Sequence, residues 1–171
     1  MSGRLPPTAA MVVMIAVVAF TPVLAGGRTF DTAAHTGDTM VWHARVAEAI
    51  GGAHLPAWDD TAGLGAPLTG DARRAALYPA AWIVAALPLP WGVDALLIAH
   101  LALLGAGAAA WARRRGADPV ASAVAGGAAM LSVSATTMAI EGGAIYAAAW
   151  LPWIGWAADR VAASRGARGV V

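Results

Sequence analysis

Long apolar runs separated by short polar segments dominate the sequence, and a run of about 20 residues can cross a bilayer as one helix. Four such runs lie at residues 8–25, 93–112, 120–140 and 144–158. A fifth run, 75–89, is short and contains Pro79 and Pro88, which disfavour a continuous helix. The pattern predicts an all-α integral membrane protein with about four transmembrane helices, or five if 75–89 also crosses.

The first run, 8–25, allows two interpretations. It follows a single Arg4 and ends in Val23-Leu24-Ala25, so it fits a secretory signal with a small-residue cleavage site. It also fits a retained transmembrane helix. We favour retention because the remaining runs are themselves membrane-spanning candidates.

Residues 26–74 differ from the rest of the chain, because they hold six of the ten acids and three of the four histidines. The sequence therefore predicts one large extracytoplasmic loop with short interfacial helices. The expected divisions are a transmembrane helix at 1–25, the loop at 26–92 with 75–89 interfacial or re-entrant, a three-helix membrane bundle at 93–158 and a cytoplasmic tail at 159–171.

Orientation follows from arginine, since basic residues in short loops stay on the cytoplasmic side. All eleven basic residues are arginines, and a four-span topology with a cytoplasmic N-terminus puts seven of them inside, including the run 113–115. If 75–89 crossed the membrane, that run would lie outside. The rule therefore favours four spans.

Composition agrees with a membrane protein: 59% of residues are hydrophobic, 12% are charged, and the mean hydropathy is +0.64. A net charge of +1 gives no basic field for nucleic acid. The absence of cysteine excludes disulfides and thiolate chemistry. No phosphate-binding loop, dinucleotide fingerprint, HExxH or GxSxG pattern occurs.

Local signals refine the expected helices. Asp118 before Pro119 is typical of a helix start, and Asp94 has the same capping interpretation. Small residues at 105–110 and 125–128 predict close helix packing. Residues 39–50 read as a short helix that ends at Gly51-Gly52 and lies on the membrane surface.

Asp38, immediately before that helix, has two interpretations. It can cap the helix by accepting a backbone N–H, or it can act as a general base at the membrane boundary. Asp31, His35 and Asp38 share one face if the segment is helical, which leaves a divalent metal open. No other cofactor is predicted.

Three further polar positions are ambiguous. The acids of Trp58-Asp59-Asp60-Thr61 fit a solvated turn. His100, inside an apolar run, is either functional or a neutral histidine bonded to a neighbouring helix. Glu141 fits an ordinary loop acid, or with His100 a transport pathway.

Several short motifs occur in a characteristic order. They are Gly37-Asp38, Leu55-Pro56-Ala57-Trp58, Gly63-Leu64-Gly65-Ala66-Pro67-Leu68, Asp71, Leu77-Tyr78-Pro79, Leu87-Pro88, His100 and Trp150-Leu151-Pro152. In this order the chain resembles, from about residue 31 to 160, the amino-terminal part of YfhO-like bacterial membrane proteins. That family is similar in turn to the GT-C glycosyltransferases, which take sugars from polyprenyl-phosphate carriers outside the membrane.

The resemblance implies a multi-pass protein of the bacterial inner membrane that uses a lipid-linked sugar donor. By position, Asp38 matches the catalytic carboxylate, and Asp71 is a second acidic candidate. We infer substrate-binding roles for Arg45, Arg73, Arg74, Tyr78 and Glu141, with an arginine pairing the leaving lipid phosphate. Family members continue through more spans, so a further membrane segment or subunit is expected to complete the donor cavity.

Two functions from different classes follow. The first is the amino-terminal module of a GT-C-like glycosyltransferase that acts on an outer-face acceptor among the membrane lipids. The second is a non-catalytic membrane subunit that packs on a partner membrane protein. Catalysis predicts loop carboxylates around a cavity, whereas the subunit hypothesis predicts carboxylates that cap helices or pair with the loop's own arginines.

Overall fold

The structure, a computed structural model, describes residues 7–25, 27–61, 63–70, 76–84, 86–141 and 143–168. It is mostly helical, as predicted. The helices are α1 (Pro7–Leu24), the π-helical turn η1 (His35–Thr39), α2 (Met40–Gly51), α3 (Pro79–Val84), α4 (Trp91–Arg114), α5 (Pro119–Met130), α6 (Val133–Ile140), α7 (Ala144–Ala148) and α8 (Leu151–Arg168). A small antiparallel ribbon joins β1 (Trp58–Asp59) to β2 (Ala66–Pro67).

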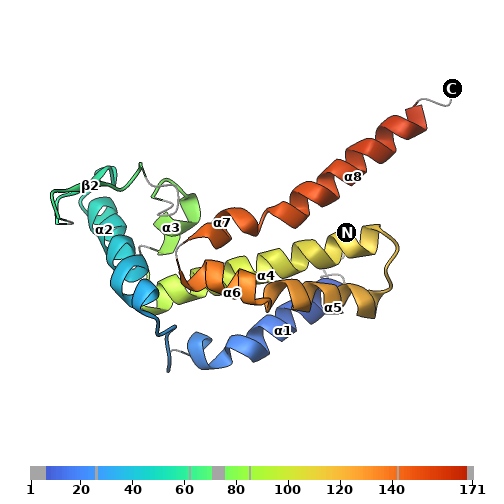
Figure 1. Ribbon diagram of the computed structural model, residues 1–171, viewed down its shortest axis with the longest axis horizontal. Helices are drawn as coiled ribbons and strands as arrows, with labels where there is room; N and C mark the ends of the chain where they lie inside the picture. Colours follow the sequence, from blue (N-terminus) through green and yellow to red (C-terminus); the bar gives the residue numbers. More distant parts are fainter. Residues whose placement is uncertain are drawn as a thin grey trace.

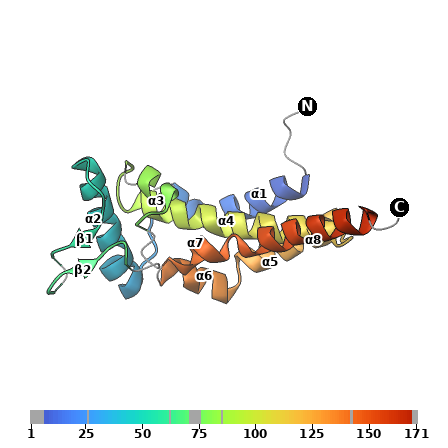
Figure 2. The ribbon, with the colours of Figure 1, turned by 90° about the horizontal axis from the view of Figure 1, so that it is seen from above.

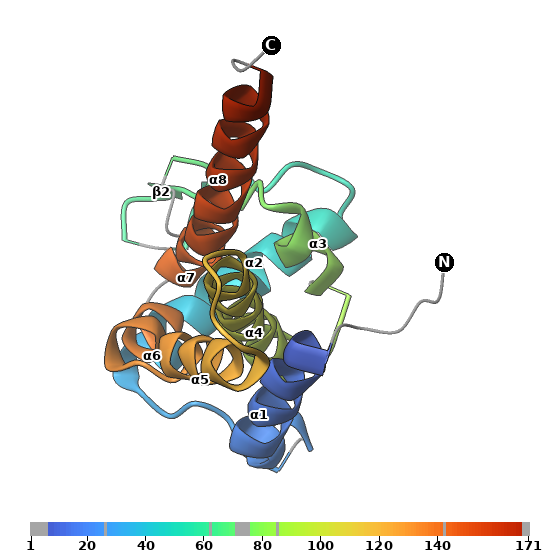
Figure 3. The same ribbon diagram turned by 90° about the vertical axis from the view of Figure 1, so that its right-hand side faces the viewer.

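The long helices lie alongside one another, while α2, α3 and the ribbon gather at one end (Figures 1 and 2). Helix α4 is central and packs against α1, α5, α6, α7 and α8. Figure 3 looks along α4 and shows these neighbours around it. Chain direction alternates: α1 and α5–α6 run toward the α2 end, and α4 and α7–α8 run away from it (Figure 1).

Among the described helices, α4 alone is both long and apolar enough to cross a bilayer unaided. A second crossing is available if α5 and α6, which are bent by 43° at their junction, form one span. In α1, the apolar stretch Ala10–Leu24 is shorter. The structure therefore supports a helical protein with one candidate membrane helix and does not confirm four or five spans.

Two predicted helices are each broken in the structure. The run 120–140 breaks at Leu131–Ser132, where the Ser132 hydroxyl accepts from the backbone N–H of Ala135 at 3.2 Å and donates to the carbonyl of Ala129 at 2.9 Å. Serine provides a local alternative to helical hydrogen bonding, which explains a break that hydropathy does not signal.

The run 144–158 breaks between α7 and α8 for a different reason. Pro152 lies in the first turn of α8 and has no backbone N–H to continue the preceding helix. Hydropathy does not separate the two helices, because the segment 144–152 contains no charged residue and its one side-chain hydroxyl is that of Tyr146.

The two capping predictions have opposite outcomes. Asp118 caps α5 as expected, since its side chain accepts from the backbone N–H groups of Val120 at 2.8 Å and Ala121 at 3.0 Å. These two hydrogen bonds lower the pKa of Asp118. Asp94 is not a cap: Pro90 precedes α4, and Asp94 is 1% exposed inside the first turn.

Close packing of α4 on α5 depends on two glycines, which confirms the prediction from the small residues. A Cβ on Gly126 would lie 2.6 Å from the carbonyl oxygen of Gly105, and a Cβ on Gly105 would lie 2.9 Å from the carbonyl oxygen of Gly126. Backbone therefore meets backbone at this crossing, with no flexible side chain that could move aside.

Replacing Gly126 with alanine is expected to lower the free energy of unfolding by about 1–3 kcal/mol, because the helices must separate. Gly127→Ala is the matched control, since its Cβ would meet Ile15 at an ordinary 3.4 Å. That variant should be neutral or stabilising by up to about 1 kcal/mol through helix propensity. Thermal unfolding in detergent measures both, and equal effects would contradict the packing argument.

Candidate functional site

The described segments between α1 and α4 converge on the end of the bundle where α4 begins and α6 turns into α7 (Figures 1 and 2). Most of the polar side chains that are buried together lie here. Three groups are distinct: a histidine–aspartate pair, a cluster of aromatic and histidine rings, and an arginine pocket in the loop.

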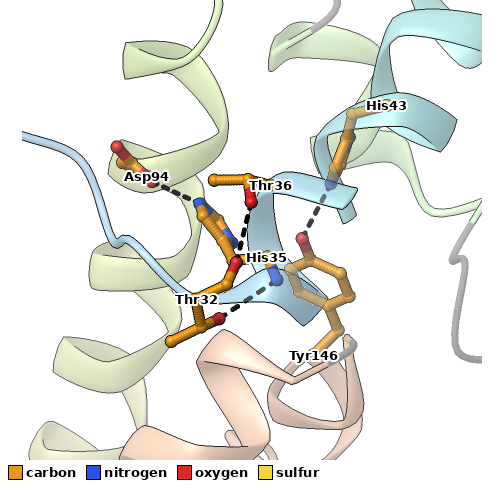
Figure 4. Close-up of polar contacts among 6 residues, drawn as sticks. All are labelled: Thr32, His35, Thr36, His43, Asp94 and Tyr146. Carbon is orange, nitrogen blue, oxygen red and sulfur yellow. Dashed lines mark hydrogen bonds and ion pairs between the residues drawn. The ribbon is translucent and has the colours of Figure 1, made fainter. Parts of the chain in front are cut away.

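The pair consists of His35 in η1 and Asp94 in α4. Nε2 of His35 lies 2.8 Å from Oδ1 of Asp94, and the side chains are 0% and 1% exposed. Phe30 packs edge-on against the imidazole, with ring centroids 5.8 Å apart. Figure 4 shows the pair joining the turn before α2 to the first turn of α4. This contact fixes where α2 starts relative to α4.

The helical turn around Asp38 starts earlier than the sequence suggested. Thr32 caps it, because the backbone N–H of His35 donates to Oγ1 of Thr32 at 3.1 Å (Figure 4). The capping interpretation of Asp38 is therefore wrong, because Asp38 lies inside the turn and no side-chain cap involves it. His35 and Thr39 are buried on one side of the turn, whereas Asp38 is exposed.

The Asp38 carboxylate makes no hydrogen bond or ion pair within the described part of the chain. Thr39, the next residue, and His35, three residues earlier, are fully buried, while Asp38 itself is exposed to solvent. An exposed, unengaged carboxylate can accept a proton or bind a cation.

The ring cluster centres on Tyr146 of α7. The Tyr146 hydroxyl lies 3.0 Å from Nε2 of His43 (Figure 4), and its ring contacts those of Tyr78 and His100, with centroids 5.6 and 4.9 Å apart. Trp42 stacks on His43 at 3.9 Å. The cluster thereby joins α2, α4, α7 and the residues before α3.

His100 is bonded at both ring nitrogens, which fits the second of its two predicted interpretations. Nδ1 lies 2.8 Å from the carbonyl of Leu96, and the Tyr78 hydroxyl lies 2.8 Å from Nε2. A carbonyl only accepts, so Nδ1 carries a hydrogen, and Nε2 of a neutral ring accepts from Tyr78. Tyr78, predicted to bind substrate, is half-buried and engaged with His100.

Burial and the nearby His35 lower the pKa of His43 from 6.5 to about 4. The unfolded chain therefore binds a proton at His43 before the folded chain does as the pH falls. The contribution of neutral His43 to the free energy of unfolding is fully present above about pH 6.5. This contribution, up to about 3 kcal/mol, is lost as the pH falls toward 4.

Replacing His43 with glutamine should flatten this pH dependence, because glutamine can bond the Tyr146 hydroxyl without titrating. The measurement is thermal unfolding between about pH 7 and pH 4. His54→Gln, at an exposed loop histidine, is the control and should keep the wild-type slope. Equal slopes for wild type and His43→Gln would contradict the assignment to His43.

The loop pocket surrounds Arg45 and has a volume of about 310 Å³. Arg45 donates to Oε2 of Glu48 at 2.8 Å, which raises the pKa of Arg45, and its Nε lies 3.9 Å from Oδ1 of Asp59. Asp59 is buried and accepts from the backbone and hydroxyl of Thr61 at 2.9 and 2.7 Å. Arg45 is thus engaged with carboxylates of its own loop.

The remaining predicted site residues fall into two groups. Glu141 is exposed at the end of α6, at the same end of the bundle as η1. Asp71, Arg73 and Arg74 lie outside the described residues, so their roles stay predictions.

The three-residue metal hypothesis is not supported by the positions of its members. His35 is buried against Asp94, while Asp31 and Asp38 are exposed. Within the described ranges, no group of three or more His, Cys, Asp or Glu side chains could hold a metal ion.

Asp94, His43 and Tyr146 are structural members of this region that the sequence did not identify. Asp94 carried a signal, since a carboxylate beside an apolar run implies a partner or a function. Tyr146 and His43 are separated by 103 residues, and nothing in the local pattern connects them.

Comparison with known proteins does not assign a family: no family model, curated protein or solved structure matches the chain. The candidate site therefore rests on its own geometry, and the YfhO-like resemblance enters only as a proposal.

Proposed function

We propose that the chain is the amino-terminal module of a GT-C-like membrane glycosyltransferase that transfers a sugar from a polyprenyl-phosphate donor to an acceptor outside the bacterial inner membrane. The observation that carries the proposal is the placement of Asp38. Its exposed carboxylate sits on a turn held by the buried His35–Asp94 contact, at the end of the apolar helix α4. A base that serves a lipid-linked donor has to lie at such a boundary.

The proposed reaction needs one base and a stabilised leaving group. The Asp38 carboxylate takes the proton of the acceptor hydroxyl, whose oxygen forms a bond to the anomeric carbon. The bond from that carbon to the phosphate oxygen breaks, and its electron pair leaves with the lipid phosphate. An arginine stabilises the phosphate. The candidates are Arg73, Arg74 and Arg45, and Arg45 has to release Glu48 before it can bind the phosphate.

The proposed topology has four spans: α1, α4, α5–α6 and α7–α8. Their alternating directions (Figure 1) and the arginines 113–115, at the end away from α2, support a cytoplasmic N-terminus and an extracytoplasmic loop. The chain has no cysteine, so introduced cysteines report position without background.

Leu64→Cys in the loop and Ser164→Cys in α8 test this topology, since both positions are exposed. A membrane-impermeant maleimide applied to intact spheroplasts should label Leu64→Cys and leave Ser164→Cys unlabelled until the membrane is opened. Labelling of both from the same side would contradict the four-span arrangement.

The catalytic proposal is tested in membranes that carry the full chain and a radiolabelled polyprenyl-phosphate hexose. The expected result is label transferred to a product that no longer extracts with the donor lipid, at a rate that depends on the amount of chain. Donor that is consumed at the same rate in membranes lacking the chain would contradict the proposal.

A second candidate, a non-catalytic membrane subunit, is favoured by one observation. Arg45 is paired with Glu48 and lies near Asp59, which is the pairing that the subunit hypothesis predicts. The same transfer experiment separates the two candidates, because a non-catalytic subunit gives no transfer that depends on Asp38.

A further inference from the structure

A groove lies between α4 and α8 at the end of the bundle opposite α2. It has a volume of about 500 Å³ and is lined by Ala108, Trp111, Ala112, Arg115 and Pro152. Figures 1 and 3 show α8 diverging from α4 toward its C-terminal end. Along α4 the lining residues follow in the order Ala108, Trp111, Ala112 and Arg115, so the charged residue lies at the C-terminal end of the helix.

The end of the bundle that carries the groove is basic. Arg115 lines the groove, and Arg114 is joined to α8 beside it. The described charged residues of this end are Arg113, Arg114, Arg115, Arg160, Arg165 and Arg168, against Asp118 and Asp159. The formal charge of this end is therefore positive, while the surface beside it is apolar.

Asp159 holds the rim in a defined geometry. Its carboxylate accepts from Arg115 twice, at 2.6 and 3.1 Å, and from the indole N–H of Trp111 at 2.8 Å. Arg114 donates to the Asp159 carbonyl at 2.8 Å. These bonds use two of the five N–H donors of Arg115 and one of Arg114, so several charged donors stay free.

We propose that this groove binds one anionic phospholipid, with its phosphate against Arg114 and Arg115 and an acyl chain along Ala108, Ala112 and Pro152. Guanidinium donors match phosphate oxygens, tryptophan favours the membrane interface, and basic pockets between helices on the cytoplasmic side suit anionic headgroups. The proposal depends on the membrane placement of α4 but not on sugar transfer.

Charge complementarity selects this occupant. A zwitterionic lipid would bring its own cation to a rim that already has an excess of arginine. An apolar protein segment would leave the free guanidinium donors unpaired. An anionic headgroup satisfies the donors and the positive charge together.

The test measures which lipid the purified full chain retains from mixed micelles of phosphatidylglycerol and phosphatidylcholine, by native mass spectrometry. Wild type should retain phosphatidylglycerol preferentially. Arg115→Gln should reduce that preference about fivefold, the effect of one basic residue at a membrane surface. Arg115→Lys should keep most of it.

Asp159→Asn gives the decisive comparison. It removes the same ion pair as Arg115→Gln, so a merely structural role would shift lipid retention in the same direction. Because it also removes the negative charge that competes for Arg115, we expect the preference for phosphatidylglycerol to rise about fivefold. Arg28→Gln, at an exposed arginine just after α1 and at the opposite end of the bundle, is the control and should leave the preference unchanged.

Three outcomes would overturn the proposal. They are equal retention of the two lipids by wild type, as expected if a protein segment or a second copy covers the groove; an unchanged preference in Arg115→Gln; and a fall in Asp159→Asn. Each can occur whether or not the chain supports Asp38-dependent transfer, so failure of this site and failure of the glycosyltransferase proposal are distinguishable.

Discussion

Replacing Asp38 with asparagine is expected to lower sugar transfer by about 10²–10⁴-fold, the usual contribution of a positioned general base. Asparagine has nearly the same shape but cannot accept the proton of the acceptor hydroxyl. Asp38 is exposed and its side chain makes no hydrogen bond or ion pair within the described residues, so stability should change by less than about 0.5 kcal/mol. The measurement is transfer from a labelled polyprenyl-phosphate hexose at matched membrane levels.

Asp60→Asn is the matched control for this variant. Asp60 is also an exposed loop carboxylate, so its replacement removes the same charge from the same loop. Transfer should stay within a few-fold of wild type. A wild-type rate in Asp38→Asn would remove Asp38 from the mechanism, and equal losses in both variants would indicate a general charge effect.

The sequence predicted the parts of the fold that depend on local chemistry. Asp118 before Pro119 starts α5, and the small residues around Gly105 and Gly126 mark a crossing where the backbones of α4 and α5 meet. In each case a short run of residues carries the whole physical cause, a cap or a missing side chain.

The helix breaks could not be predicted from the same pattern. Both occur inside runs that are uniformly apolar or small, where hydropathy has no contrast. Serine and proline also occur within continuous membrane helices, so the presence of Ser132 or Pro152 does not by itself predict a break. This also explains why fewer candidate spans are present than hydropathy predicts.

The candidate site was predictable in outline and not in its partners. The acidic loop follows from composition, whereas Asp38 as the base is what the YfhO-like resemblance implies and stays a prediction. The contact between His35 and Asp94 joins residues 59 apart, and no local pattern selects one partner among the acids. Asp94 resembled a helix cap because that interpretation requires only a carboxylate near a helix start.

The contact between His35 and Asp94 affects both the stability of the fold and the position of the proposed base, Asp38. α2 has one buried face, formed by Trp42, His43, Val46 and Ala49, and that face does not by itself fix where the preceding turn lies. The His35–Asp94 contact fixes it at the start of α4. A variant that breaks the contact should therefore move Asp38 as well as destabilise the bundle.

Asp94→Ala is expected to lower the free energy of unfolding by about 3 kcal/mol, because it leaves a fully buried ring nitrogen of His35 without its hydrogen-bond partner. Nδ1 of His35 and Oδ2 of Asp94 already have no partner within the described residues, so His35 has no second contact to replace the lost one. Thermal unfolding in detergent, followed by intrinsic tryptophan fluorescence, measures the loss. An exposed helix cap, Asp118→Ala, is the control and should cost about 1 kcal/mol.

The double variant His35→Phe with Asp94→Leu separates the cost of an orphaned group from the net value of the pair. Replacing both partners of a buried hydrogen bond with apolar groups of similar shape can be nearly neutral, so the double variant should recover most of the stability that Asp94→Ala loses. If the double variant lost as much stability as Asp94→Ala, the unpaired ring nitrogen of His35 would not account for the loss. If Asp94→Ala were within about 1 kcal/mol of wild type, the contact would not hold α2 on α4. The proposed positioning of Asp38 by that turn would then lose its physical basis.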